Sequence, residues 1–256
     1  MTLLKVANLW MSFGGLHAVC DVSFEVRAGE LVGIIGPNGA GKSTLFNTLA
    51  GLYIPSRGKR FFEGKDVTTL KAHHMARRGI ARTFQIYMAT GDLTVVENIM
   101  VGSFMHTNSR AKARAKAQEL MEMMHLSDLG SERVANLPVA AQKRVVMATA
   151  LATNPKLLLL DEVAAGLNPA EIDEMVSMIR WVHDELKITV MLIEHVMELV
   201  INLSHRVLVL DSGRVIADGD PADVVRRPEV IKAYLGERYA AQFLAEGLGS
   251  EPSVVR

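Results

Sequence analysis

The stretch that most constrains the fold is the run Gly36-Pro37-Asn38-Gly39-Ala40-Gly41-Lys42-Ser43-Thr44. It follows the pattern G-x-x-x-x-G-K-[ST], in which glycines let backbone N–H groups close around an anion. Residues 31–35 before it predict a buried parallel strand, and residues 45–50 after it predict a helix. A phosphate-binding loop requires this strand–loop–helix context, so we prefer it to a glycine-rich turn without a ligand. We expect Lys42 to reach the β- and γ-phosphates of a nucleotide and the Ser43 hydroxyl to bind Mg²⁺.

The composition is that of a protein with a large core and no bias toward a charged partner. The chain has 256 residues, of which 49% are hydrophobic, and its 28 basic residues balance its 28 acidic residues. This balance gives no reason to expect a nucleic-acid partner or extended disorder. The single cysteine, Cys20, excludes an internal disulfide and a cysteine-rich metal site, and we expect it to be a small core residue.

The sequence also bears on location. The N-terminus lacks a basic region followed by an apolar core, and no apolar run reaches the length of about 18 residues that indicates a membrane span. We therefore expect a cytoplasmic protein.

Residues 3–28 alternate between apolar and polar side chains, which predicts two half-buried strands joined by a turn at Gly14-Gly15. Phe13 stands just before this turn. Its side chain suits either of two roles, stacking on a purine or packing against the turn.

The middle of the chain predicts a change of structure. A strand over residues 59–63, a helix over 72–78 and a buried strand over 80–85 lead into a mainly helical region at 93–150. Within that region Lys and Arg alternate with Ala over residues 110–116, which suits either contact with phosphate or lipid head groups or a solvated helix face. We interpret residues 145–153 as a helix.

Alternation of strands and helices then returns. We expect strands over 157–160 and 188–193, a helix over 170–185, a hairpin over 207–217, and helices over 221–226, 229–235 and 238–246.

Two carboxylates end the predicted strand of four leucines. Open α/β sheets bind ligands at the carboxyl ends of their strands, where Asp161 and Glu162 fall. With a phosphate-binding loop upstream, Asp161 is suited to hold Mg²⁺ through water, and Glu162 to accept a proton from an attacking water molecule.

Two further polar residues follow predicted strands. His195 follows an apolar strand and can sense a γ-phosphate and pair with the base, although a histidine there can equally be structural. Gln85 ends the strand over 80–85, and its amide can both coordinate Mg²⁺ and orient a water molecule.

Phe13, the phosphate-binding loop, Gln85, Asp161-Glu162 and His195 occur in the order found in ATPase subunits of ABC transporters, which the chain resembles over nearly its whole length. The resemblance is closest to the branched-chain amino-acid importer group. The stretches that carry it include Phe13-Gly14-Gly15-Leu16, Arg82-Thr83-Phe84-Gln85, Ala164-Ala165-Gly166-Leu167-Asn168-Pro169 and Ala233-Tyr234-Leu235-Gly236-Glu237.

This resemblance implies an α/β fold: a RecA-like P-loop core that binds ATP, an antiparallel β subdomain and a helical subdomain. It implies that Phe13 stacks on adenine, that Gln85 is the Q-loop residue and that His195 is the switch histidine. We expect one ABC ATPase domain over residues 1–240, with the helical subdomain inserted at about residues 88–150, and a C-terminal tail at 241–256.

One stretch departs from the family pattern. The family's signature, usually LSGGQ, corresponds here to Leu137-Pro138-Val139-Ala140-Ala141-Gln142-Lys143-Arg144. Pro138 replaces the usual Ser and has neither a hydroxyl nor a backbone N–H, and Val139 and Ala140 replace glycines. Loss of a hydrogen bond to a charged group costs about 1.5–3 kcal/mol. The substitutions therefore predict weaker closure on a partner's nucleotide, or pairing with a subunit that has a fuller signature.

The resemblance implies an ATP-hydrolysing subunit that powers an importer for branched-chain amino acids or related small organic acids. Its implied partners are a second ABC ATPase subunit in a homo- or heterodimer, two membrane permease subunits and, indirectly, a periplasmic or extracellular substrate-binding protein. The implied location is the inner face of the cell membrane, with peripheral attachment. Two alternatives are a low-activity regulatory subunit of a heteromeric ABC system and a soluble ABC ATPase acting on nucleic acid or translation.

Overall fold

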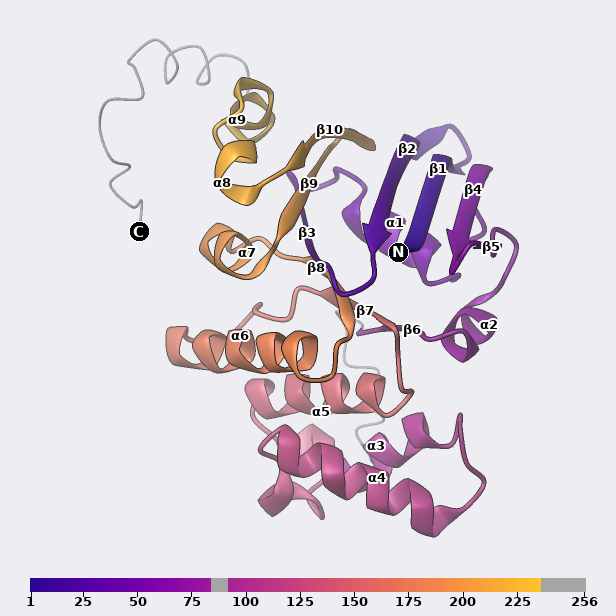
Figure 1. Ribbon diagram of the computed structural model, residues 1–256. Helices are drawn as coiled ribbons and strands as arrows, with labels where there is room; N and C mark the ends of the chain where they lie inside the picture. Colours follow the sequence, from indigo (N-terminus) through magenta and orange to yellow (C-terminus); the bar gives the residue numbers. More distant parts are fainter. Residues whose placement is uncertain (84–91, 236–256) are drawn as a thin grey trace.

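The core of the fold is a six-stranded sheet. A computed structural model describes residues 1–83 and 92–235 (Figure 1). The strand order is β10-β9-β3-β8-β7-β6, and all neighbouring strands run parallel except β10 and β9. The strands are β3 (Leu31–Ile35), β6 (Ile80–Arg82), β7 (Leu157–Asp161), β8 (Thr189–Ile193), β9 (Arg206–Asp211) and β10 (Arg214–Gly219). The predicted α/β core and its C-terminal hairpin are confirmed.

A second, antiparallel sheet lies beside the first, as the alternating sequence at 3–28 predicts. Its order is β2-β1-β4-β5, and the strands are β1 (Thr2–Phe13), β2 (Leu16–Arg27), β4 (Arg57–Phe62) and β5 (Lys65–Asp66). The turn between β1 and β2 lies at Gly14-Gly15, where Gly14 has a left-handed φ of 58°. Cys20 is buried with a free thiol, as expected.

Two hydrophobic clusters cover the two faces of the six-stranded sheet, and β7 shows how the sequence separates them. Successive side chains of a strand point to opposite faces. Leu157 and Leu159 therefore join the cluster that contains helix α1 (Lys42–Leu49) and the antiparallel sheet, whereas Leu158 and Leu160 join the other, which contains the helices that follow β6 in the chain. A continuous apolar run is what a parallel strand buried on both faces requires.

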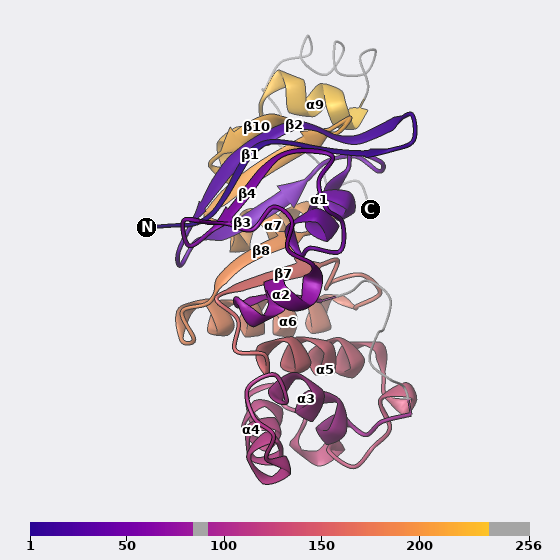
Figure 2. The same ribbon diagram turned by 90° about the vertical axis from the view of Figure 1, so that its right-hand side faces the viewer.

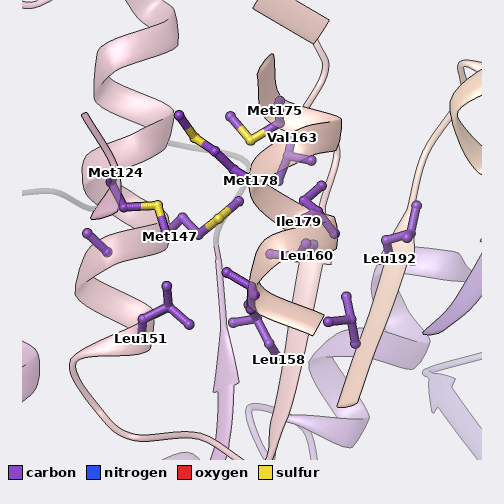
Figure 3. Packing of buried hydrophobic residues seen from close by; sticks show 14 of the residues in the cluster. Met124, Met147, Leu151, Leu158, Leu160, Val163, Met175, Met178, Ile179 and Leu192 are labelled. Atoms are coloured by element: carbon purple, nitrogen blue, oxygen red, sulfur yellow. The ribbon is translucent and has the colours of Figure 1, made fainter. Parts of the chain in front are cut away.

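The second cluster is rich in methionine. Figure 3 shows Met124, Met147, Met175 and Met178 meeting between helices and β7. Flexible thioether side chains fill irregular gaps where helices cross. The helices on this side include α5 (Val139–Leu151), α6 (Pro169–Asp184), α7 (Met197–Leu203) and α8 (Pro221–Val224).

The predicted helical region is confirmed over its described residues. It contains α3 (Val95–Ser103), α4 (Arg110–Met123), two short 3-10 turns (Ser127–Leu129 and Val134–Asn136) and α5. Figures 1 and 2 agree that α3, α4 and α5 lie at the end of the molecule away from the antiparallel sheet. On α4 the side chains of Arg110, Lys112 and Arg114 are exposed while Ala113 and Ala117 are buried, so the basic residues occupy a solvated face.

Several predicted boundaries were wrong. Helix α5 begins at Val139 instead of 145, because Pro138 takes the extended conformation that precedes a helix. Strand β6 ends at Arg82, so Thr83 lies outside the strand that was predicted to include it, and the last two residues of that prediction lie outside the described residues. Helix α7 was not predicted. Helices α2 (Ala72–Arg77) and α9 (Pro228–Leu235) lie within two residues of their predicted bounds.

Part of the prediction cannot be compared with the structure. Gln85, the helix predicted at 238–246 and the tail at 241–256 lie outside the described residues. Among the residues that the structure does describe, no helix is both long enough and apolar enough to span a bilayer.

Candidate functional site

The phosphate-binding loop lies between the end of β3 and the start of α1, as predicted. Two of its glycines are required by close packing. A Cβ on Gly36, which has a φ of 148°, would lie 2.0 Å from the Leu210 carbonyl oxygen, and one on Gly41, with a φ of 98°, would lie 2.2 Å from the Ala18 carbonyl oxygen. Since no side chain tolerates such distances, only glycine lets the loop fit between β9 and β2.

Hydrogen bonds tie the same loop to both sheets. The Gly213 N–H donates to the Ala40 carbonyl at 3.0 Å, and the Gly213 carbonyl accepts from the Cys20 N–H of β2 at 2.8 Å. Gly213 belongs to the turn between β9 and β10, so one residue links the loop, the core sheet and the antiparallel sheet.

A buried arginine holds the far end of α1. Arg60 of β4 is fully buried, and its guanidinium donates to the carbonyls of Thr48 and Leu49 at the end of the helix and to the Thr68 carbonyl at 2.7 Å. Burial lowers the Arg60 pKa to about 10. The last carbonyls of a helix lack partners within it and carry a partial negative charge, so this cation stabilises them.

Lys42 lies across its own loop. The side chain is only 6% exposed, and Nζ donates to the carbonyls of Gly36 at 2.7 Å and Pro37 at 3.0 Å. Burial lowers the Lys42 pKa, whereas the carboxylates of Glu162 and Asp161 raise it. Ser43 lies in the first turn of α1 beside it. A buried cation beside the positive end of a helix is suited to bind phosphate.

Asp161 ends β7 and is 3% exposed. Its Oδ2 forms an ion pair of 2.6 Å with Arg82, a residue that also bonds to Asn47 of α1. Burial raises the Asp161 pKa, and the Arg82 guanidinium lowers it. The sequence alone gives Arg82 no role in the site, and the contact becomes evident only from the pairing of β6 with β7.

The other oxygen of Asp161 suits a cation. Among the residues that the structure describes, Asp161 Oδ1 is buried and has no hydrogen-bond partner. An orphaned carboxylate oxygen beside a phosphate-binding loop fits Mg²⁺, which binds through one or two carboxylates together with phosphate oxygens and water. No group of three or more His, Cys, Asp or Glu side chains suited to a metal occurs in the described part of the chain.

Glu162 and His195 meet at the carboxyl ends of neighbouring strands. Strands β7 and β8 pair in parallel with Asp161 opposite Ile193, so the residues that follow each strand lie side by side. The Glu162 N–H donates to the Ile193 carbonyl at 2.9 Å, and His195 Nε2 lies 2.9 Å from Glu162 Oε1. Glu162 has a left-handed φ of 50°, which L side chains rarely adopt and which is typical of functional sites.

Phe13 ends β1 with 43% of its surface exposed. Its ring lies edge-on to Tyr53, with centroids 5.2 Å apart and an interplanar angle of 79°. Tyr53 follows α1, so this aromatic pair lies between the β1–β2 turn and the helix that begins at the loop. An exposed aromatic ring here is available to stack on a base, and both of its predicted roles stay open.

The divergent signature forms the start of α5. Pro138 is the residue that precedes the helix and makes no side-chain cap, and Val139 is exposed in the first turn. The signature segment therefore forms a helix N-terminus, which lacks the hydroxyl of the usual Ser.

Comparison with known proteins gives two family matches. The family described as ABC transporter matches residues 19–165, and the family described as Branched-chain amino acid ATP-binding cassette transporter matches residues 214–240.

Individual relatives of the chain have names that agree with these two family matches. The chain is 38% identical to the high-affinity branched-chain amino acid transport ATP-binding protein BraF of Pseudomonas aeruginosa, over 92% of this chain and 98% of BraF. It is 37% identical to the corresponding protein LivG of Escherichia coli over the same shares. Among solved structures, a nucleotide-free ATP-binding cassette from an ABC transporter aligns with a TM-score of 0.83 and 32% identity, over 93% of this chain and all of that one. An ADP-bound cassette aligns with a TM-score of 0.84 and 31% identity, over the same shares.

Proposed function

The chain belongs to the ABC transporter family, and we propose that it is the ATP-hydrolysing subunit of an importer. The observation that carries this proposal is the convergence of Lys42, Asp161 and the Glu162–His195 pair at one edge of the core sheet. This set contains a cation for phosphate, a carboxylate for a metal and a carboxylate that can act as a base. A regulatory subunit without hydrolysis would not need the base or its histidine partner.

Each residue has a role in the proposed hydrolysis. Lys42 leaves the carbonyls of its own loop and binds the β- and γ-phosphates, and the loop N–H groups orient them. Asp161 Oδ1 and the Ser43 hydroxyl would hold Mg²⁺, which when bound offsets charge on the phosphate oxygens. Gln85 is proposed as a further ligand and as an orienter of water. Phe13 is proposed to stack on adenine.

Glu162 is the proposed general base. Its carboxylate accepts a proton from the water that attacks the γ-phosphate. In the tautomer with a proton on Nε2, His195 donates to Glu162 Oε1 and fixes the direction of the carboxylate. The histidine is more exposed than the glutamate, so it is the member of the pair that a γ-phosphate can approach from solvent.

The proposed substrate class follows from the relatives. BraF and LivG are named for transport of branched-chain amino acids, and the family match at 214–240 carries the same description. We therefore propose branched-chain amino acids or related small organic acids as the cargo. Cargo selection belongs to the other subunits of such a system.

The proposed assembly is a head-to-tail dimer with a second ABC ATPase subunit. In it the α5 N-terminus of each subunit would complete the other's nucleotide site. Two permease subunits and a substrate-binding protein would complete the transporter, with this chain attached peripherally to the inner face of the membrane. The expected organisation, with an ATPase domain at 1–240, a helical insertion at about 88–150 and a tail at 241–256, is part of this proposal.

An apolar groove is available for a permease. It has a volume of about 480 Å³ and lies between the α1, α2 and β6 side and the helices α3 and α5. Leu52 and Val101 line it and are exposed. Exposed apolar residues that line a groove are typical of a protein-binding site, and we propose that this groove contacts a permease subunit.

The experiment that tests this function uses Glu162→Gln. We expect the substitution to lower phosphate release by at least about 100-fold, the usual contribution of a general base, and to leave ATP binding intact. Unchanged phosphate release would exclude Glu162 as the base. For the transport role, the chain is expressed with its permease and binding protein in a bacterium that lacks branched-chain amino-acid import. Uptake of labelled leucine should appear and should be lost with Glu162→Gln.

A further inference from the structure

Two charged side chains that have not yet been given a role contact the backbone around the Glu162–His195 pair. The first is Lys143, in the second turn of α5. Its Nζ donates to the Glu162 backbone carbonyl at 2.8 Å, and the Ala165 N–H donates to the same oxygen at 3.3 Å. Glu162 has a left-handed backbone conformation, which is unfavourable for an L residue, and these hydrogen bonds help to stabilise that conformation.

The second is Glu194, which joins β8 to His195 and is 3% exposed. Its carboxylate accepts from the Ala164 N–H at 2.8 Å and from the His195 N–H. Burial raises the Glu194 pKa, and the nearby positive charge of Lys143 lowers it. Glu194 therefore fixes the backbone on both sides of the pair, at Ala164 after Glu162 and at His195 itself.

From these contacts we infer that Lys143 and Glu194 are positioning residues, which hold Glu162 and His195 in their reactive arrangement and make that arrangement depend on the position of α5. This inference rests on the proposed function, because it concerns the base of that reaction. Lys143 lies about one helical turn, roughly 6 Å, beyond the first residue of α5. A displacement of the α5 N-terminus by a partner's nucleotide would move the Lys143 ammonium and, through it, the Glu162 carbonyl.

The chemistry of the two residues favours this role over simple packing. Removing charges from water is costly, and apolar residues of similar volume often stabilise a protein as well or better. Lys143 contacts the backbone of the proposed base directly, and Glu194 contacts the backbone of the histidine that binds it. Both residues therefore act on the orientation of the Glu162–His195 pair.

The test compares steady-state ATP hydrolysis of the full chain with that of Lys143→Met, Lys143→Arg, Glu194→Gln and Glu162→Gln. Methionine keeps the length and most of the volume of lysine but cannot donate. Lys116→Met is the matched control, because Lys116 also lies in a helix of the helical region and pairs with a carboxylate, Glu119, at 2.8 Å.

We expect Lys143→Met to lower kcat by about 10- to 100-fold, the loss that follows a misplacement of about 1 Å, with KM for ATP within about twofold. Lys143→Arg should recover most of kcat because it keeps a charged donor. Glu194→Gln should also lower kcat. Its effect combined with Lys143→Met should be smaller than the product of the two, because both act on one arrangement.

The outcomes separate the two proposals. If Glu162→Gln is inactive while Lys143→Met and Glu194→Gln have the kcat of Lys116→Met, the positioning role is overturned and the proposed function stands. If Glu162→Gln retains full activity, the proposed function itself fails. Should Lys143→Met not fold, Glu194→Gln carries the same comparison, and a rise in KM without a fall in kcat in Glu194→Gln would also overturn the inference.

Discussion

A serine at position 138 would restore the hydroxyl that the signature segment lacks. Pro138 directly precedes α5 in an extended conformation, with ψ at 153°, and makes no side-chain cap. Serine favours this conformation, so Pro138→Ser should leave the path of the chain unchanged. The new hydroxyl would lie at the helix N-terminus, where the proposed dimer brings the partner's γ-phosphate.

The effects on folding should nearly cancel. A serine cap stabilises a helix by about 1 kcal/mol. Loss of the proline frees the unfolded chain and destabilises the protein by about 0.4–1 kcal/mol. We therefore expect the free energy of unfolding to change by less than about 0.5 kcal/mol, which separates any change in folding from a change in assembly.

The effect on the dimer should be large. A hydrogen bond to a charged group contributes about 1.5–3 kcal/mol, and a symmetric sandwich contains two copies of the contact. The lower value gives about 3 kcal/mol in total, a dimer dissociation constant about 150-fold lower. Without ATP we expect no change in the dimer dissociation constant, because the new hydroxyl forms its hydrogen bond with a phosphate of ATP.

Sedimentation equilibrium in the Glu162→Gln background, with and without Mg-ATP, would measure this constant. Urea denaturation of both proteins would measure folding. If the ATP-dependent constant changes by less than about threefold while folding is unaffected, the hydroxyl does not reach a phosphate, and our explanation of the divergent signature is wrong.

Three further predictions concern the stacking of Phe13 on adenine, the end of α1 and the start of α3. Phe13→Leu should weaken binding of a fluorescent ATP analogue by at least about fivefold, because stacking on a base contributes about 1–3 kcal/mol; equal affinity would leave Phe13 as a residue that packs the turn. Arg60→Met should destabilise the protein to urea by about 1–3 kcal/mol, since buried carbonyls at the end of α1 lose a donor; a more stable variant would refute this. Glu97, in the capping box of α3, has a pKa below its usual 4.5 because it accepts from Thr94. The ionised Glu97 carboxylate therefore stabilises the fold above pH 4.5, and this stabilisation is lost as the pH falls through the lowered pKa. Glu97→Gln should unfold at a lower urea concentration than the native protein at neutral pH and at the same urea concentration in strong acid. A difference that persists in acid would contradict the assignment.

The fold was largely predictable because its strongest features are local. The four leucines at the start of β7 predict a strand buried on both faces, and the alternation at 3–28 predicts the antiparallel pair. The start of α5 was missed because Val139, Ala140 and Ala141 carry no cap signal. The helix follows instead from the conformation of Pro138 and from packing, since Ala141 is buried against the methionine-rich cluster.

The site was predictable where residues belong to contiguous motifs and not where contacts join distant elements. Lys42, Asp161 and Glu162 follow predicted strands or the loop itself. Arg82 and Asp161 are 79 residues apart in the chain, and Lys143 and Glu162 are 19 residues apart in two different elements. Arg82 looked like any basic residue in a strand, and only the order of strands in the sheet places it beside Asp161. Contacts of this kind depend on topology, which periodicity does not specify.

These contacts also show how the two halves of the proposed composite site differ. The half that binds this chain's own nucleotide is fixed from several directions, by Gly213, which ties the loop to both sheets, and by Arg82, which holds Asp161. The half offered to a partner is the N-terminus of α5, where Pro138 makes no side-chain cap. It is connected to the Glu162–His195 pair through Lys143, whose ammonium donates to the Glu162 carbonyl. A phosphate site held by contacts within the chain and a signature helix that lacks the usual hydroxyl suit the proposed motor, in which binding of ATP is intrinsic to the chain and hydrolysis waits for the second subunit.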